Sequence, residues 1–218
     1  MKSNETLQKD VQDDIKWEPL MNAAEIGVTV KDGIVTLSGT VNSYLKKIEA
    51  ENAAKNVSGV LGVVENIIVE FSKPINKTDN EIAAEVTYAL QCNSDISSEN
   101  LQIHVENGWV VLTGQQHWDF QKQIARNTVN NLQCTKGVIN NISIFLNKHQ
   151  IVELDDITRA LQRNWSIEDK KISVAVVGNT VTLSGIVNSL YQKDTAERIT
   201  WNAPGVWTVN NELFIEIN

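Results

Sequence analysis

The side chains that could ligate a metal are few in this sequence, and they are not grouped. The three histidines are His104 in a predicted strand, His117 before a predicted helix and His149 in a predicted linker. Their spacing matches no ligand pattern such as HExxH, in which two histidines share one face of a helix. The sequence therefore predicts no metal site.

Cysteine and serine give no better case for catalysis. Cys92 and Cys134 have neither CxxC spacing nor a nucleophile signature, and we expect two reduced thiols unless the protein is exported, when a bridge becomes plausible. A hydroxyl recurs beside a glycine at Ser38, Thr113 and Ser184, but the Gly-x-Ser-x-Gly pattern of a nucleophile elbow is absent. We therefore predict no enzymatic activity and no bound cofactor.

Tryptophan is the residue type here that suits binding to a partner. Trp109 alternates along its predicted strand with the apolar residues Val110 and Leu112, so it faces the opposite side of the sheet. Val111 and Phe145 are predicted on that side as well. Three other tryptophans, Trp118, Trp201 and Trp207, stand at positions where the corresponding segments elsewhere in the chain carry other residues. We predict a binding surface drawn from Trp109, Val111, Phe145, Trp118, Trp201 and Trp207.

The elements that must position these residues occur three times. The octapeptide DGIVTLSG at 32–39 returns as NGWVVLTG at 107–114 and as GNTVTLSG at 178–185. The closing glycines are 75 and 71 residues apart, so the repeating unit is a small domain rather than a solenoid repeat of about 20–50 residues. We predict three domains, at 1–72, 77–147 and 152–218. Because modules this small have thin cores, we expect them to pack on one another, in a homo-oligomer or on a partner.

Each repeat shows the same order of hydrophobic patterns. Apolar residues four apart predict a first helix, preceded by Asp79 and Asp155 as N-caps in repeats 2 and 3. Strict alternation then predicts two strands joined by a two-residue turn, followed by a second, alanine-rich helix and a third strand. The fold class is α+β: three tandem αββαβ domains, each a three-stranded mixed sheet with two helices on one face. Glycines are predicted to form the turns and to permit a bend after the second strand, at Gly33, Gly39, Gly108, Gly114, Gly178 and Gly185.

This pattern resembles the BON (bacterial OsmY and nodulation) domain family, in three tandem copies. The residues that carry the resemblance are Asp-Gly-x-Val-x-Leu-x-Gly, the alanine-rich helix and a following Gly-Val-x-x-Val strand. The resemblance to OsmY-like proteins implies a non-enzymatic, osmotic-stress-associated protein that attaches to phospholipid surfaces or cell-envelope partners. Another branch of the family implies a potassium-responsive sensor, but it carries a LysM domain, and no LysM-like segment is seen here.

Charge and the N-terminal residues bound the remaining possibilities. The net charge is −8 and is spread over all three repeats, so a nucleic-acid partner is not expected. The absence of an apolar leader predicts a cytoplasmic protein, or a periplasmic one if the natural N-terminus was trimmed. A sheet with helices on one side leaves its other face open, and apolar residues there predict a cover: another repeat, a second copy, a protein partner or lipid. The acidity opposes anionic lipid and keeps open the alternative of a cytosolic protein–protein interaction module.

Overall fold

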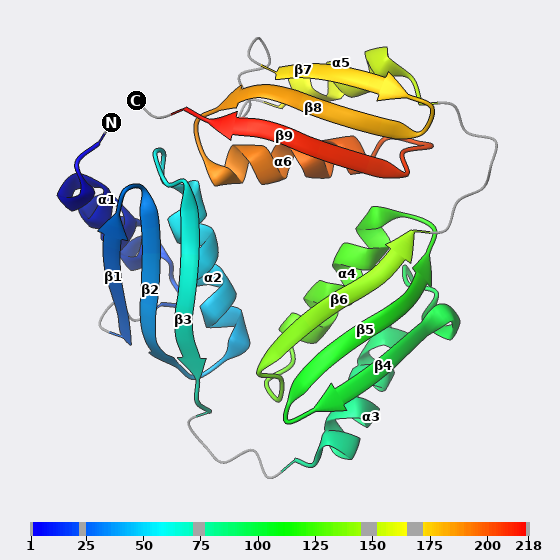
Figure 1. Ribbon diagram of the computed structural model, residues 1–218. Helices are drawn as coiled ribbons and strands as arrows, with labels where there is room; N and C mark the ends of the chain where they lie inside the picture. The colour runs from blue at the N-terminus through cyan, green and yellow to red at the C-terminus, as the bar shows by residue number, and fades with distance from the viewer. Residues whose placement is uncertain (1, 22–24, 72–76, 145–151, 165–171, 217–218) are drawn as a thin grey trace. The chain divides into compact units, whose positions relative to one another are not determined.

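The computed structural model describes residues 2–21, 25–71, 77–144, 152–164 and 172–216, and its described part contains three three-stranded sheets, each accompanied by two α-helices. Figure 1 shows each sheet with its helices packed on one face. The predicted fold class, three tandem αββαβ domains, is confirmed. Repeat 1 comprises α1 (Asn4–Trp17), β1 (Ile26–Lys31), β2 (Ile34–Val41), α2 (Tyr44–Asn56) and β3 (Gly62–Val69).

Repeats 2 and 3 follow the same order. Repeat 2 comprises α3 (Asp79–Gln91), the 3₁₀ turn η2 (Ser98–Asn100), β4 (Leu101–Glu106), β5 (Trp109–Gln116), α4 (Asp119–Asn130) and β6 (Gly137–Ile144). Repeat 3 comprises α5 (Leu154–Gln162), β7 (Ile172–Val177), β8 (Thr180–Val187), α6 (Leu190–Trp201) and β9 (Thr208–Ile215).

The second strand of each repeat is the central strand of its sheet, an arrangement that the sequence left open. The first two strands form an antiparallel hairpin, and the third pairs in parallel with the second in repeats 2 and 3. In repeat 1 the amide of Leu61 donates to the carbonyl of Gly33 and that of Glu70 to Val41, so β3 also runs parallel to β2. The helical crossover between them supplies the length that a parallel connection requires.

The core of each repeat lies between the sheet and its two helices. The alternate positions of the central strand are fully buried at Val35 and Leu37, and at the equivalent pairs of β5 and β8. The first helix buries a stripe four residues apart, Leu7, Val11 and Ile15 in α1, as expected of an amphipathic helix on a sheet. The buried residues of the central strand face the buried stripe of the helices, so the intervening strand residues lie on the open side of each sheet.

The closing glycines lie inside the central strands and not at a bend, so this part of the prediction was wrong. Gly39 and Gly114 have φ of 138° and 121°, and the strands continue for two more residues. A Cβ on Gly114 would lie 2.0 Å from the carbonyl oxygen of Asn100, and one on Gly39 would lie 2.1 Å from that of Glu25. The glycine is required because the carbonyl of the residue just before the first strand occupies the space that a Cβ would need.

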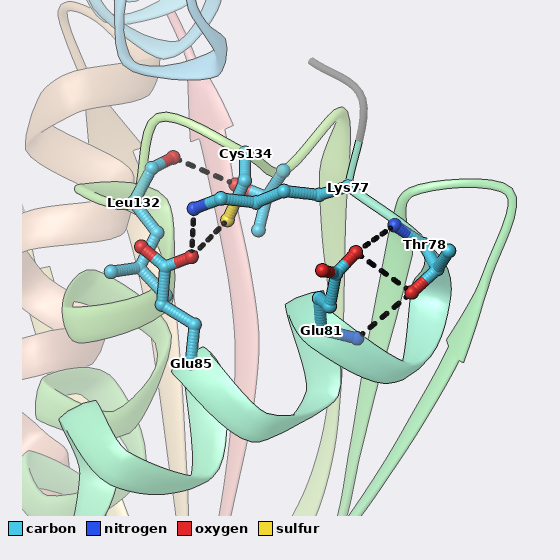
Figure 2. A network of polar contacts seen from close by, with 7 residues as sticks. Lys77, Thr78, Glu81, Glu85, Leu132 and Cys134 are labelled. Atoms are coloured by element: carbon cyan, nitrogen blue, oxygen red, sulfur yellow. Dashed lines mark hydrogen bonds and ion pairs between the residues drawn. The ribbon is translucent and has the colours of Figure 1, made fainter.

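Neither of the two aspartates expected as helix N-caps, Asp79 and Asp155, stands at an N-cap position. Thr78 caps α3 in a capping box with Glu81 (Figure 2), while Asp155 lies within α5. The carboxylate of Asp79 instead accepts hydrogen bonds from the turn amides of Asn107 and Gly108, at 2.8 and 3.0 Å. Asp79 thus ties the start of α3 to a hairpin turn 28 residues away.

Candidate functional site: the open sheet faces

The open face of repeat 2 carries an apolar patch at the end of the sheet nearest the hairpin turn. Trp109 and Val111 lie on β5, and Ile139, which pairs with Val111, lies on β6. Trp109 is 43% exposed and Ile139 45%, whereas the intervening Val110 and Leu112 are buried against the helices. A Cβ on Gly137 would lie 2.3 Å from the Trp109 ring, so the indole lies across β6 at a position that only glycine leaves free. We call Trp109, Val111 and Ile139 the repeat 2 patch.

Repeat 1 has the same arrangement with smaller side chains. Ile34 and Val64 stand 75 residues before Trp109 and Ile139 and are similarly exposed. A Cβ on Gly62 would lie 3.2 Å from Cδ1 of Ile34, so this isoleucine also lies over a glycine of the third strand. We call Ile34 and Val64 the repeat 1 patch.

The open face of repeat 3 has exposed apolar side chains at both ends of its sheet: Val177, which is 79% exposed, pairs with Thr180 at the hairpin end, and two others lie at the opposite end. Ile186 and Phe214 are paired on β8 and β9 and are 44% and 73% exposed. The positions that correspond to Trp109 and Ile139 carry the polar residues Thr180 and Asn210. We call Ile186 and Phe214 the repeat 3 patch.

The structure does not gather the predicted binding residues into one surface. Trp109 and Val111 share the open face of repeat 2, but Trp118 is half-buried beyond the other end of β5, just before α4. Trp201 ends α6 and packs against the core of repeat 3, and Trp207 is 36% exposed just before β9. Phe145 lies outside the described residues. That these residues form a common binding surface stays a prediction.

Three members of the patches were missed, namely Val64, Ile139 and Ile186. Each takes an outward position in the alternation of its own strand, which is the signal that could have found it. Assigning it to a patch also requires the register between the second and third strands, and the sequence does not give that register.

Cys134 lies in a small polar network on the helix side of repeat 2 (Figure 2). Its thiol is buried and donates a hydrogen bond of 3.4 Å to Oε2 of Glu85, which also forms an ion pair with Lys77. Burial, followed by the hydrogen bond to Glu85, raises the pKa of Cys134 to about 11. A nucleophilic cysteine needs its thiolate, so at neutral pH this thiol is unreactive and serves packing.

Repeat 2 has no glycine at the position that follows its second helix. Gly59 and Gly205, at the positions that match Cys134, have φ of 96° and 82°. In repeat 2 the buried hydroxyl of Thr135 instead donates to the carbonyls of Val129 and Leu132 at the end of α4. The carbonyl of Val129 also accepts from the amide of Leu132 at 3.0 Å, so the threonine hydroxyl adds to the backbone hydrogen bonds that follow α4.

The two histidines that the structure describes, His104 and His117, lie on different parts of repeat 2. His104 is exposed on the open face of β4 opposite Val111, and His117 follows β5, whereas His149 lies outside the described residues. Within the described ranges, no three His, Cys, Asp or Glu side chains are placed to hold a metal ion. In the same part of the chain, no helix has the length and apolar character needed to cross a bilayer.

Comparison with known proteins finds a matching family model and one related protein. A family model of the BON domain matches residues 3–70, 78–144 and 155–216. An "Uncharacterized protein in gshII 5'region" of Anaplasma centrale is 34% identical over 94 residues, which is 42% of this chain and 62% of that protein's length. The chain thus spans less than two thirds of this curated relative.

Two solved structures show low overall similarity. CdsD, a structural protein of the type III secretion system of Chlamydia trachomatis, has a TM-score of 0.26 and 18% identity, covering 97% of this chain and 92% of its own. The periplasmic domain of PrgH has a TM-score of 0.20 and 12% identity, covering 88% of this chain and 95% of its own.

Proposed function

The chain belongs to the BON domain family, with three copies in tandem, and from this premise we propose that it is a non-enzymatic, stress-associated binding protein that attaches to phospholipid surfaces or cell-envelope partners. The observation that supports this proposal most directly is the exposure of apolar side chains on the open sheet faces. Phe214 is 73% exposed and lies beside Ile186, on a face that carries no helix of its own repeat. Grouped exposed apolar residues of this kind mark interaction surfaces.

The polar side chains of the repeats support binding over catalysis, because those that converge serve the fold. Asp79 holds a turn, and Cys134 is protonated and buried. Asn140 and Asn211 occupy one position on the third strand of repeats 2 and 3, where each side-chain amide donates to a carbonyl of the second helix. These groups are already engaged within their own repeat.

The charge of the chain sets which lipid surface it should prefer. The net charge of −8 is repelled by anionic headgroups, whereas the burial of Phe214 and Ile186 in a bilayer interface depends little on headgroup charge. We therefore expect attachment to neutral phosphatidylcholine vesicles to be at least as strong as attachment to phosphatidylglycerol vesicles, with the difference shrinking as salt screens the repulsion.

Co-sedimentation with vesicles of these two compositions tests the proposal. The wild-type chain should pellet with neutral vesicles, and Phe214→Ser should release it, because serine removes the largest exposed apolar side chain of the repeat 3 patch. Ala175→Ser is the matched control, since Ala175 is exposed on β7 of the same sheet and should keep the wild-type behaviour. Failure of the wild type to bind either composition would reject the lipid proposal.

A protein partner is the second candidate, and the repeat 2 patch favours it. Glu106 pairs directly with Trp109 across the hairpin, which places a carboxylate beside the indole. A carboxylate at that place opposes insertion into a lipid surface but suits a protein surface that offers a complementary cation.

A further inference from the structure

The repeat 1 and repeat 2 patches match in position and differ in the charge that flanks them. Lys31 pairs with Ile34 across the first hairpin, and Glu106 pairs with Trp109 across the second. Directly paired residues of antiparallel strands lie on the same face, so each charged side chain stands beside its patch. Lys31 and Glu106 are both exposed and are 75 residues apart, the same spacing that relates Ile34 to Trp109.

Repeat 3 shares neither feature. Its residue at the position of Lys31 and Glu106 is Val177, and the positions of the apolar pair carry Thr180 and Asn210. Repeats 1 and 2 therefore share an apolar patch that lies over a glycine of the third strand and has a charged residue beside it. The charge is positive in repeat 1 and negative in repeat 2.

We propose that the repeat 1 patch of one copy of this chain docks face to face on the repeat 2 patch of a second copy, with Lys31 opposite Glu106. This inference rests on the proposed function in one respect, that the open sheet faces are binding surfaces. Sheets that pack face to face lie about 10 Å apart with interdigitating side chains, and both patches offer exposed apolar side chains for such packing. Each copy has one patch of each kind, so two copies offer the partners for two such contacts.

The flanking charges select this pairing over the alternatives. Two repeat 2 patches would bring Glu106 against its own equivalent, and two repeat 1 patches would do the same with Lys31, so both like pairings are opposed. An anionic lipid surface would meet the Glu106 carboxylate beside Trp109. A second copy offers this carboxylate a cation, the ammonium group of Lys31.

Sedimentation velocity of the full chain tests the proposal. At tens of micromolar the wild type should sediment as a dimer of about twice 24.3 kDa, and Trp109→Ser should raise the dimer dissociation constant at least about 30-fold, the loss typical of a central aromatic contact. Ile139→Ser should also raise the dimer dissociation constant, and it provides a second test in case Trp109→Ser does not fold. Thr180→Ala, at the register position of Trp109 in repeat 3, should leave the dimer intact.

Charge reversal tests the pairing itself. Lys31→Glu and Glu106→Lys should each weaken the dimer about fivefold per contact, and the double reversal should restore it. A monomeric wild type, or a double reversal no better than its singles, would overturn the inference.

Vesicle co-sedimentation of the same variants separates the two proposals. Trp109→Ser should still pellet through the repeat 3 patch, and Phe214→Ser should still dimerise. A wild-type chain that stays monomeric but still pellets with vesicles would count against the docking inference alone.

Discussion

Replacement of Gly114 by alanine should destabilise repeat 2 far more than an ordinary glycine-to-alanine change. The new Cβ would lie 2.0 Å from the carbonyl oxygen of Asn100, whereas Cβ contacts in proteins essentially never fall below 3.0 Å. The backbone at Asn100 and the backbone at Gly114 must therefore move apart. A left-handed φ costs alanine about 1–2 kcal/mol, and separating β4 from β5 at the Leu101–Gly114 pair would weaken the ladder by about 1 kcal/mol more. The expected loss of about 2–3 kcal/mol is a large part of the stability of so small a domain.

Hydrogen exchange of the intact chain, read by mass spectrometry, would measure this loss repeat by repeat. The most protected amides of β4 and β5 should exchange about 30- to 150-fold faster in Gly114→Ala, and those of repeat 1 should keep their rates. Gly178→Ala is the matched control, because Gly178 also has a positive φ, of 61°, but a Cβ there meets no atom within 4 Å. If the two variants accelerated exchange in their own repeats equally, the carbonyl contact would not be the reason for this glycine.

Three further predictions concern the polar contacts of repeat 2. Asp79→Ala should lower the free energy of unfolding by about 1–2 kcal/mol in a denaturant titration, because two turn amides lose their acceptor; an unchanged midpoint would contradict the role given to Asp79. Iodoacetamide at pH 8 should label the exposed Cys92 in the folded chain and leave Cys134 unlabelled until denaturant is added, and equal labelling would show that Cys134 is accessible. The hydrogen bond from Lys77 lowers the pKa of Glu85 below its usual 4.5, so its stabilisation is present above about pH 4.5 and is lost as pH falls through the folded value. The difference in stability between wild type and Lys77→Met should therefore shrink on acidification from pH 6 to pH 3, and a constant difference would refute the ion pair.

Local patterns were sufficient for the fold class because helix and strand periodicities differ so clearly in this chain. The alternation around Val110 and Leu112 correctly assigns the buried side of β5 and places Trp109 on the open face. Strand order could not be derived, since a hairpin leaves both of its edges available to a third strand. The role of Gly114 was misread for a related reason: the carbonyl that demands glycine lies 14 residues earlier in the chain.

The candidate site was only partly predictable for the same physical reason. Trp109 and Val111 follow from the alternation of one strand, but Ile139 joins them only through the parallel register of β5 and β6. Asp79 resembles a helix cap in sequence, and its true partner is a turn that tertiary packing brings to it. Contacts within one element were readable from the residues, and contacts between elements required coordinates.

The claim on which this account depends is that apolar side chains on the open sheet faces are the contact surface for partners. Carbene footprinting of the full chain, with and without neutral vesicles, reads that surface residue by residue. We predict that labelling of Ile186 and Phe214 falls on binding, while labelling of the exposed helix residue Tyr88 stays constant. Unchanged labelling of Phe214 in chain that has sedimented with vesicles would contradict the claim.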